Sequence, residues 1–284
     1  ARRAASATRV APVTLGANAQ LPGALALVAT GHDPGSHTTG HRQDDQPDVA
    51  RSQDDVRAAQ ALRYRVFAEE MGAHLSGNEP GLDQDLFDPY CDHLLIQDDD
   101  TGEVVGTYRI LPPAQARKLG SYYSDTEFDL TRLQSIRSQL VEVGRACVHP
   151  DHRNGSAITL LWSGLAQYML DHGHRYLMGC ASVTMADGGH HAASLHRLLE
   201  QTHLAPVEWR ASPRCALPLH ALNTRLEVDA PPLLKGYLRL GAMVCGEPAW
   251  DPDFNTADFL ILLPMHKLNA RYARHFLKTD VFTN

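Results

Sequence analysis

The sequence lacks several features that would assign it to a specialised class of protein. None of its apolar runs approaches the roughly 20 residues that cross a bilayer as a helix. It has no basic excess, because its formal net charge is −7, which argues against general nucleic-acid binding. Its five cysteines are odd in number and contain no CxxC pair, so free thiols in a reducing compartment are expected. The remaining composition, 43% hydrophobic and 21% charged, is that of an ordinary globular protein.

The chain of 284 residues divides by composition into two parts. Residues 1–53 are dominated by small and polar residue types, and they predict a flexible tail ahead of a folded domain at 54–284. The apolar segment 21–29 is short for the core of a signal peptide, and no clear cleavage site follows it. We therefore interpret this segment as part of the tail.

Hydrophobic periodicity gives the order of elements in the folded part. A helix is predicted at 56–71, a β-hairpin at 93–97 and 104–111, and a strand-helix-strand unit at 140–148, 158–169 and 176–183. A further helix is expected at 187–204. Later strands are expected at 209–217, 243–245 and 259–263. This order predicts one α/β or α+β domain on a mixed sheet.

The segment 140–157 combines the features that most often carry chemistry. Glu142 and Arg145 are charged residues inside an apolar strand, and a loop containing Gly155 leads into the next helix. Backbone N–H groups of such a loop and helix N-terminus can bind a phosphate. An ordinary corner with a surface ion pair is the alternative. On a regular strand the two charges face opposite sides, unless a bulge intervenes.

Two arginines lie in apolar surroundings, Arg63 on a predicted helix face and Arg109 in a predicted strand. Arginine is rarely buried without a partner, so we expect both to pair with acidic residues such as Asp85 and Asp88. A purely structural ion-pair network is the competing interpretation. Taken alone, the two aspartates are more typical of residues that cap turns.

Two other constellations are rejected. Cys147 and His149 resemble a nucleophile and base, but free cysteine is usually a small buried hydrophobe. No metal site is expected, because the histidines at 190, 191, 196 and 203 contain no pair at the i, i+4 spacing of helical zinc ligands.

The order of several separated motifs resembles a known family. Arg63–Phe67, Asp85–Asp88, Gly106–Arg109 and Glu142–Arg145 are similar to the charged motifs of acyl-homoserine-lactone synthases, which belong to the GNAT acyltransferase superfamily. A closer resemblance is to bacterial ornithine N-acyltransferases and long-chain N-acyl amino acid synthases. It is carried by Cys91–Leu94, Val105–Arg109, Glu142–Pro150, Lys235–Leu238 and Asp251–Thr256, and covers roughly residues 57–276.

The resemblance implies a GNAT-like α/β (α+β) fold with a mixed central sheet flanked by helices. It also implies transfer of a long-chain, 3-hydroxy fatty acyl group from acyl-carrier protein to the α-amine of ornithine, without a bound cofactor. The sequence departs here from the usual coenzyme A loop, because His152 occupies the expected Gln or Arg position. This weakens the case for coenzyme A and is compatible with the carrier protein as donor. The implied catalytic residues are Glu142 and Arg145. The implied substrate-binding residues are Arg63, Phe67, Asp85, Asp88 and Arg109, and the implied phosphopantetheine-binding residues are Ala146, Cys147, Val148, Arg153, Asn154, Gly155 and Ser156.

Alternatives stay open at this point. The acceptor could be tyrosine, glycine, serine or lysine, or S-adenosylmethionine as in lactone synthases, and acetyl-coenzyme A could be the donor. A non-catalytic, membrane-active protein of the same fold is a different class. We expect a cytoplasmic protein, with the inner-membrane surface as a further partner to be tested. A basic surface that includes Arg117, Lys118, Arg132, Arg137 and Arg153 is the predicted docking site for the acidic carrier protein.

Overall fold

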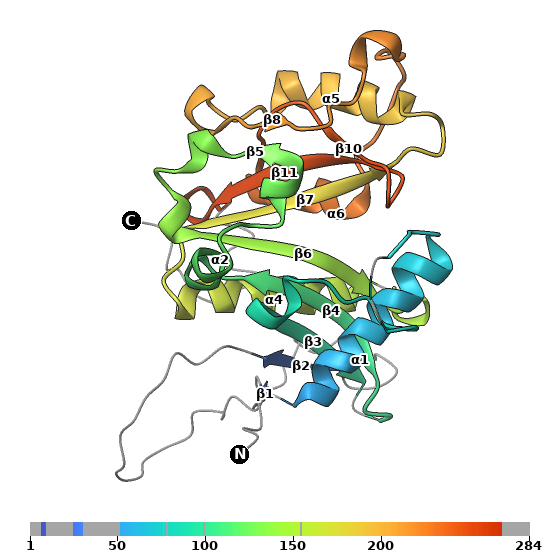
Figure 1. The fold of residues 1–284 in the computed structure, drawn as a ribbon, viewed down its shortest axis with the longest axis vertical. Helices are drawn as coiled ribbons and strands as arrows, with labels where there is room; N and C mark the ends of the chain where they lie inside the picture. Colours follow the sequence, from blue (N-terminus) through green and yellow to red (C-terminus); the bar gives the residue numbers. More distant parts are fainter. Residues whose placement is uncertain are drawn as a thin grey trace, which may run out of the picture. The chain divides into compact units, whose positions relative to one another are not determined.

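The computed structural model describes residues 7–9, 25–30, 52–75, 77, 79–98, 100–153 and 155–268. The chain forms two compact units. The first unit is built from residues 1–71, 75–110 and 145–168, and the second from residues 72–74, 111–144 and 169–284. Strand β6 (Leu140–Val148) contributes to both, because the division falls between Gly144 and Arg145. Figure 1 labels the main elements.

The first unit is a sheet with the strand order β1-β2-β3-β4-β6. Its hairpin consists of β3 (Asp92–Asp98) and β4 (Val104–Leu111), as predicted from the sequence. The short strands β1 (Ala7–Arg9) and β2 (Leu25–Thr30) lie within the range predicted as a tail, and β2 pairs with β3. The other residues before 52 are outside the described part, so the division near residue 53 stays a prediction.

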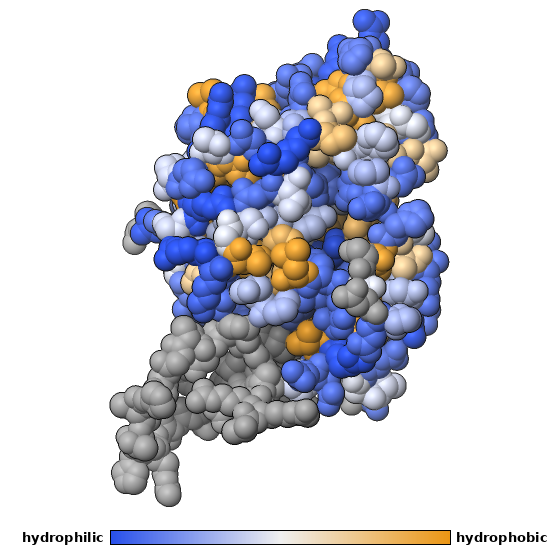
Figure 2. Space-filling view, viewed as in Figure 1, coloured by the Kyte–Doolittle hydropathy of each residue, from blue (hydrophilic) through white to orange (hydrophobic). Residues whose placement is uncertain are grey.

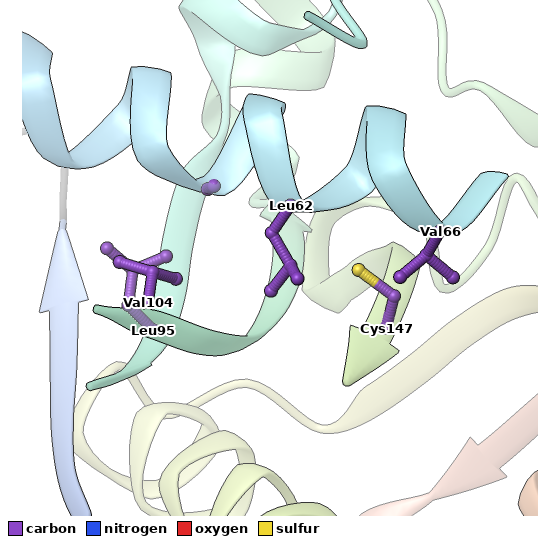
Figure 3. Packing of buried hydrophobic residues seen from close by; sticks show 6 residues of the cluster. Leu62, Val66, Leu95, Val104 and Cys147 are labelled. Atoms are coloured by element: carbon purple, nitrogen blue, oxygen red, sulfur yellow. The ribbon is translucent and has the colours of Figure 1, made fainter. Parts of the chain in front are cut away.

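Helix α1 (Gln53–Tyr64) covers a buried cluster of the first unit (Figure 3). Ser52 caps the helix, since its hydroxyl accepts a hydrogen bond from the Asp55 N–H at 2.9 Å. Leu62 is 5% exposed, and each such buried leucine contributes roughly 1.5–3 kcal/mol to folding. The cluster comprises Ala59, Leu62 and Val66 with Leu95 of β3, Val104 of β4 and Cys147 of β6. The chain continues as a π-helix (Arg65–Glu70), a wider turn that apolar spacing does not predict.

The second unit has the strand order β6-β7-β11-β10. Strand β7 (Tyr176–Thr184) is parallel to β6, and the crossover between them contains helix α4 (Ser156–Asp171). This confirms the predicted strand-helix-strand unit. Strand β11 (Thr256–Pro264) is antiparallel to β7, and it also pairs with β10 (Ala249–Asp251) and β9 (Met243–Val244). Parallel and antiparallel pairs together make a mixed sheet, as expected.

Short helices complete the second unit. They are α2 (Pro113–Leu119), α3 (Ser124–Glu127), α5 (His190–Thr202) and α6 (Pro232–Leu240). The predicted strand at 209–217 is wrong. Only β8 (Ser212–Pro213) is extended there and pairs with β5 (Phe128–Asp129), after a 3-10 turn at Val207–Trp209. Pro213 has no N–H to donate, which limits how far this strand can pair.

Among the described residues, no helix combines the length and apolarity needed to span a bilayer. Figure 2 shows mostly hydrophilic side chains on the face drawn, with apolar residues in separate groups. Large exposed apolar side chains occur in both units, for example Leu86, Val207 and Trp250. Isolated exposed apolar residues are normal on soluble surfaces and require no partner.

Candidate active site

A buried cluster of arginines and aspartates lies within the first unit. Arg63, on α1, is fully buried, and its Nε lies 3.0 Å from Asp83 Oδ2 while its Nη2 lies 2.6 Å from Asp88 Oδ2. Gln60, one turn earlier on the same helix, donates to Asp88 Oδ2 at 2.9 Å. The prediction that Arg63 is buried with an acidic partner is therefore confirmed.

Two more arginines complete the cluster from the strands. Arg109 of β4 is 5% exposed, and its Nη1 lies 2.6 Å from Asp85 Oδ2 and 2.9 Å from Asp88 Oδ1. Arg145 of β6 approaches Asp83 at 3.2 Å and Asp85 at 3.6 Å. Three guanidinium groups thus alternate with three carboxylates, which leaves the cluster with no formal net charge.

The cluster keeps its carboxylates ionised. Burial alone would raise the pKa of Asp88, but the guanidinium groups of Arg63 and Arg109 outweigh burial and hold this pKa well below its usual range. Arg109 likewise lowers the pKa of Asp85 against the effect of burial. Burial, together with the charge of Arg63, lowers the pKa of His93 to about 4, so this buried imidazole is neutral at physiological pH.

The sequence predicted five of these six charged residues and missed Asp83. Asp83 is 2% exposed and contacts both Arg63 and Arg145, so it joins the helix to β6. Its position two residues before Asp85 was the available signal. Phe67, predicted to bind substrate, packs partly buried against the α1 cluster, and its binding role stays a prediction. Phe87 was also missed, although Arg109 lies 5.8 Å above its ring.

Glu142 is anchored in the second unit by three short hydrogen bonds. Its carboxylate accepts from the backbone N–H of Tyr123 at 2.6 Å, the N–H of Ser124 at 2.7 Å and the hydroxyl of Ser124 at 2.5 Å. The side chain is 5% exposed. Hydrogen bonds to the ionised form of a carboxylate favour that form, which is the form a general base needs.

The backbone of β6 departs from a regular strand at Arg145, whose φ is +52°. This left-handed conformation costs a non-glycine residue roughly 1–2 kcal/mol. A regular strand would keep φ negative at this position, so the backbone direction changes locally at Arg145. That a bulge brings Glu142 and Arg145 together stays a prediction.

This strain yields a stability prediction. Arg145→Ala and Arg145→Gly both remove the contacts with Asp83 and Asp85, but only glycine relieves the backbone. We expect the glycine variant to be more stable than the alanine variant by about 1 kcal/mol, measured by urea unfolding. Equal midpoints would mean that Arg145 adopts an ordinary strand conformation in solution.

The predicted donor-binding residues form the end of β6 and the turn after it. Ala146 and Val148 are half-buried, and Cys147 is buried in the α1 cluster. Burial raises the pKa of the Cys147 thiol to about 12, and this agrees with rejecting it as a nucleophile. After β6, the His149 N–H donates to the Val105 carbonyl at 2.8 Å.

The predicted phosphate-binding loop is described in part. Arg153 forms two hydrogen bonds with the Glu70 carboxylate, at 2.6 and 2.7 Å, and a third with the Val148 carbonyl at 3.0 Å. Gly155 has a φ of +87°, and Ser156 begins α4. Asn154 lies outside the described residues. The N-terminus of α4, whose dipole favours a negative charge, follows this loop directly.

Comparison with known proteins adds the family. The model of the acetyltransferase (GNAT) domain matches residues 62–163. An L-ornithine N(alpha)-acyltransferase of Rhodobacter capsulatus is 39% identical over 247 residues, which cover 81% of this chain and 93% of the relative. A second, from Agrobacterium fabrum, is 38% identical and covers 80% of this chain and 83% of the relative. The chain belongs to the L-ornithine N(alpha)-acyltransferases.

Membership of the L-ornithine N(alpha)-acyltransferases makes this protein an N-acyltransferase with the GNAT fold, as the sequence motifs predicted. Among solved structures, a CoA-dependent acyl-homoserine lactone synthase is 15% identical, with a TM-score of 0.46, and covers 82% of this chain and 85% of its own. An N-acyl amino acid synthase from uncultured soil microbes is 13% identical, with a TM-score of 0.42, and covers 76% of this chain and 89% of its own.

Proposed function

We propose that this enzyme transfers a long-chain, 3-hydroxy fatty acyl group from acyl-carrier protein to the α-amine of ornithine, giving lyso-ornithine lipid. The observation that carries the acceptor is the shared identity of 37–39% with four relatives that all bear the name L-ornithine N(alpha)-acyltransferase. In the reaction the amine nitrogen attacks the thioester carbonyl carbon. A C–N bond forms, the C–S bond breaks and the pantetheine thiol leaves.

Glu142 is the proposed general base. Its carboxylate, held by three donors from Tyr123 and Ser124, takes the proton that the α-amine loses, directly or through a water molecule. The proton then passes to the departing thiolate. A strand N–H among Ala146, Cys147 and Val148 would stabilise the negative charge that develops on the carbonyl oxygen.

The charged cluster around Arg109 has two proposed roles. Arg109 and Arg145 either bind the acceptor carboxylate or orient Asp85 and Asp88. The contacts with aspartates favour the second role, because each of the two guanidinium groups already faces acidic partners. Arg63 and Phe67 would support this arrangement from the first helical segment.

The proposed donor binds along the end of β6, with its phosphate near Arg153, Asn154, Gly155 and Ser156. Carrier protein presents one phosphate on its pantetheine arm, and the α4 N-terminus is suited to a phosphate of this kind. Arg153 would have to leave Glu70 to reach it. The enzyme needs no bound cofactor in this scheme, because the acyl-phosphopantetheine is a substrate.

Docking of the acidic carrier protein can be tested on α2. Arg117 and Lys118 are exposed in its last turn, whereas Arg137 already pairs with Asp125. We expect the double variant Arg117→Glu/Lys118→Glu to raise the KM for acyl-carrier protein about tenfold with kcat unchanged, since surface charge mainly affects encounter. The double variant Arg197→Glu/Arg225→Glu makes the same change of charge at two other exposed positions of the second unit and is the matched control. An unchanged KM would remove α2 from the docking surface.

The proposal is tested by mass spectrometry of lipid extracts from a host that expresses the protein. A new acylated ornithine, absent with Glu142→Gln, is the expected result, and its mass gives the chain length and hydroxylation. Purified enzyme with matched acyl-carrier protein and acyl-coenzyme A then identifies the donor. Acylation of tyrosine, glycine or serine instead of ornithine would contradict the acceptor. The absence of any acylated product from a folded protein would contradict the reaction.

A further inference from the structure

A second acidic cluster lies in the second unit. One ligand atom each of Glu127, Cys180 and Asp258 lies within 4.8 Å of the other two. Asp258 is 4% exposed and accepts a hydrogen bond from the Thr256 hydroxyl at 2.8 Å. Both carboxylate oxygens of Glu127 are buried, next to the side chains of Tyr123 and Asp258. Within the described part of the chain, neither carboxylate forms an ion pair with a lysine or arginine.

Two buried carboxylates without a cation are costly. Burial, followed by the charge of Asp258, raises the pKa of Glu127 to about 8, and burial raises the pKa of Asp258. The first-unit cluster shows the contrast, because its aspartates are each compensated by arginine. Without a cation the pair therefore keeps a proton on Glu127 at neutral pH, and a ligand that brings a positive charge can take the place of this proton.

The cluster shares a sheet face with the proposed base. Glu142 is aligned with Met178 of β7, and Asp258 of β11 is aligned with Ser182 of β7. Met178, Cys180 and Ser182 alternate along β7 and therefore project from one face. Ser182 is exposed and Cys180 is half-buried, so solvent reaches the edge of the cluster.

Ser124 links the two groups directly. Its hydroxyl donates to Glu142 at 2.5 Å and lies 3.4 Å from Cys180 Sγ. One carboxylate oxygen of Glu127 and one of Asp258 lie within 4.8 Å of this sulfur. The two amines of an extended ornithine are separated by five bonds, or about 6 Å, which is the same scale.

We propose that Glu127 and Asp258 bind the side-chain ammonium of the acceptor and thereby select a diamino acid. The proposal rests on the proposed function, with the α-amine at Glu142. An ammonium has three N–H donors, and the four oxygens of two carboxylates can accept them. Its charge restores the ionised form of both acids, as Arg63 and Arg109 do for Asp88. Tyrosine, glycine and serine supply no such charge, so the site separates ornithine from these acceptors.

The test compares ornithine with norvaline, which is ornithine without its side-chain amine. In Glu127→Gln and in Asp258→Asn we expect the KM for ornithine to rise about 10- to 100-fold, the usual loss when a buried charge loses its partner. The kcat/KM for norvaline should be unchanged or higher. Glu208→Gln, an exposed glutamate of the same unit, is the control.

Each outcome decides between the two proposals. Unchanged preference for ornithine in both variants would overturn the ammonium site and leave the proposed function standing. Failure of the wild-type protein to acylate ornithine would remove both. Stoichiometric zinc in the purified wild-type protein, lost in Cys180→Ala, would make the cluster a metal site and overturn the ammonium site.

Stability supplies a readout that a structural role would not give. Below pH 4.5 Glu127 is protonated in both folded and unfolded protein, and between pH 4.5 and 8 only the folded protein holds the proton, so stability falls as pH rises. Glu127→Gln removes this loss, and we expect its Tm to exceed that of the wild type, by more at pH 8 than at pH 5. A lower Tm than that of the wild type at both pH values would mean that Glu127 has a structural role. The groups that act on the cluster are Tyr123, Glu142, Cys180, Asp251 and Asp258.

Discussion

Glu142→Gln is expected to lower kcat at least about 100-fold, because a side-chain amide cannot accept the proton of the attacking amine. The KM for ornithine should change little. The variant should fold, since the amide oxygen still accepts hydrogen bonds from residues 123–124. The amide nitrogen of the new glutamine cannot accept the N–H that it faces at residue 123 or 124. We therefore expect the unfolding free energy to fall by about 1 kcal/mol. Steady-state kinetics and thermal unfolding measure both effects.

Ser124→Ala is the control for this variant. It removes one of the three donors to Glu142 but keeps the carboxylate and both backbone N–H groups. We expect a rate loss below about tenfold. If Glu142→Gln kept the wild-type rate while Ser124→Ala unfolded the protein, Glu142 would serve only to anchor the start of α3.

Asp88→Asn is expected to destabilise the protein by about 3–5 kcal/mol, because it leaves two buried guanidinium groups short of negative charge. Asp88 is 7% exposed and lies 2.6 Å from Arg63 and 2.9 Å from Arg109. Guanidinium chloride unfolding gives the difference. Glu79→Gln is the matched control, since it breaks an ion pair with Arg57 in which both side chains are about half exposed. Such surface pairs contribute little to stability, because water screens their charges.

The difference in unfolding free energy between the wild type and Asp88→Asn is expected to depend on pH. The pKa of Asp88 lies below the usual 3.8, so the folded protein keeps this carboxylate ionised where the unfolded chain protonates it. The stability that Asp88 provides is thus complete above pH 4 and is lost as the pH falls further. We expect the gap between wild type and Asp88→Asn to narrow in acid. A gap of constant size from pH 6 to pH 2.5 would contradict the role of this charge.

Hydrophobic periodicity and the burial of charged residues predicted those elements and ion pairs that depend on interactions between residues close in the sequence or on the charge of a single residue. The hairpin at β3 and β4 and the helix α4 follow from periodicity, and buried arginines imply acidic partners because an unpaired guanidinium is too costly inside a protein. The pairing of Arg145 with Asp83 could not be read in this way. Arg145 makes this contact from a backbone conformation with positive φ, which its position in the sequence alone does not encode.

Glu127 and Asp258 show a second limit. Each resembles an ordinary acidic residue in sequence, one ending a short helix and the other within an apolar strand. Only the antiparallel pairing of β11 with β7 brings Asp258 beside Cys180, and only the turn held by Glu142 brings Glu127 to the same place. Long-range pairing of strands is set by the whole sheet, which single-residue patterns do not determine.

The division of β6 between two units has a consequence for synthesis of the protein. The first unit needs residues 145–168, which a ribosome delivers only after part of the second unit has been made. Its early segments, α1 with β3 and β4, therefore lack Cys147, the last residue of their buried cluster, until β6 has been made. We expect nascent chains stalled before residue 145 to depend on chaperones and to be cleaved readily by proteases. Chains stalled beyond residue 168 should begin to resist proteolysis.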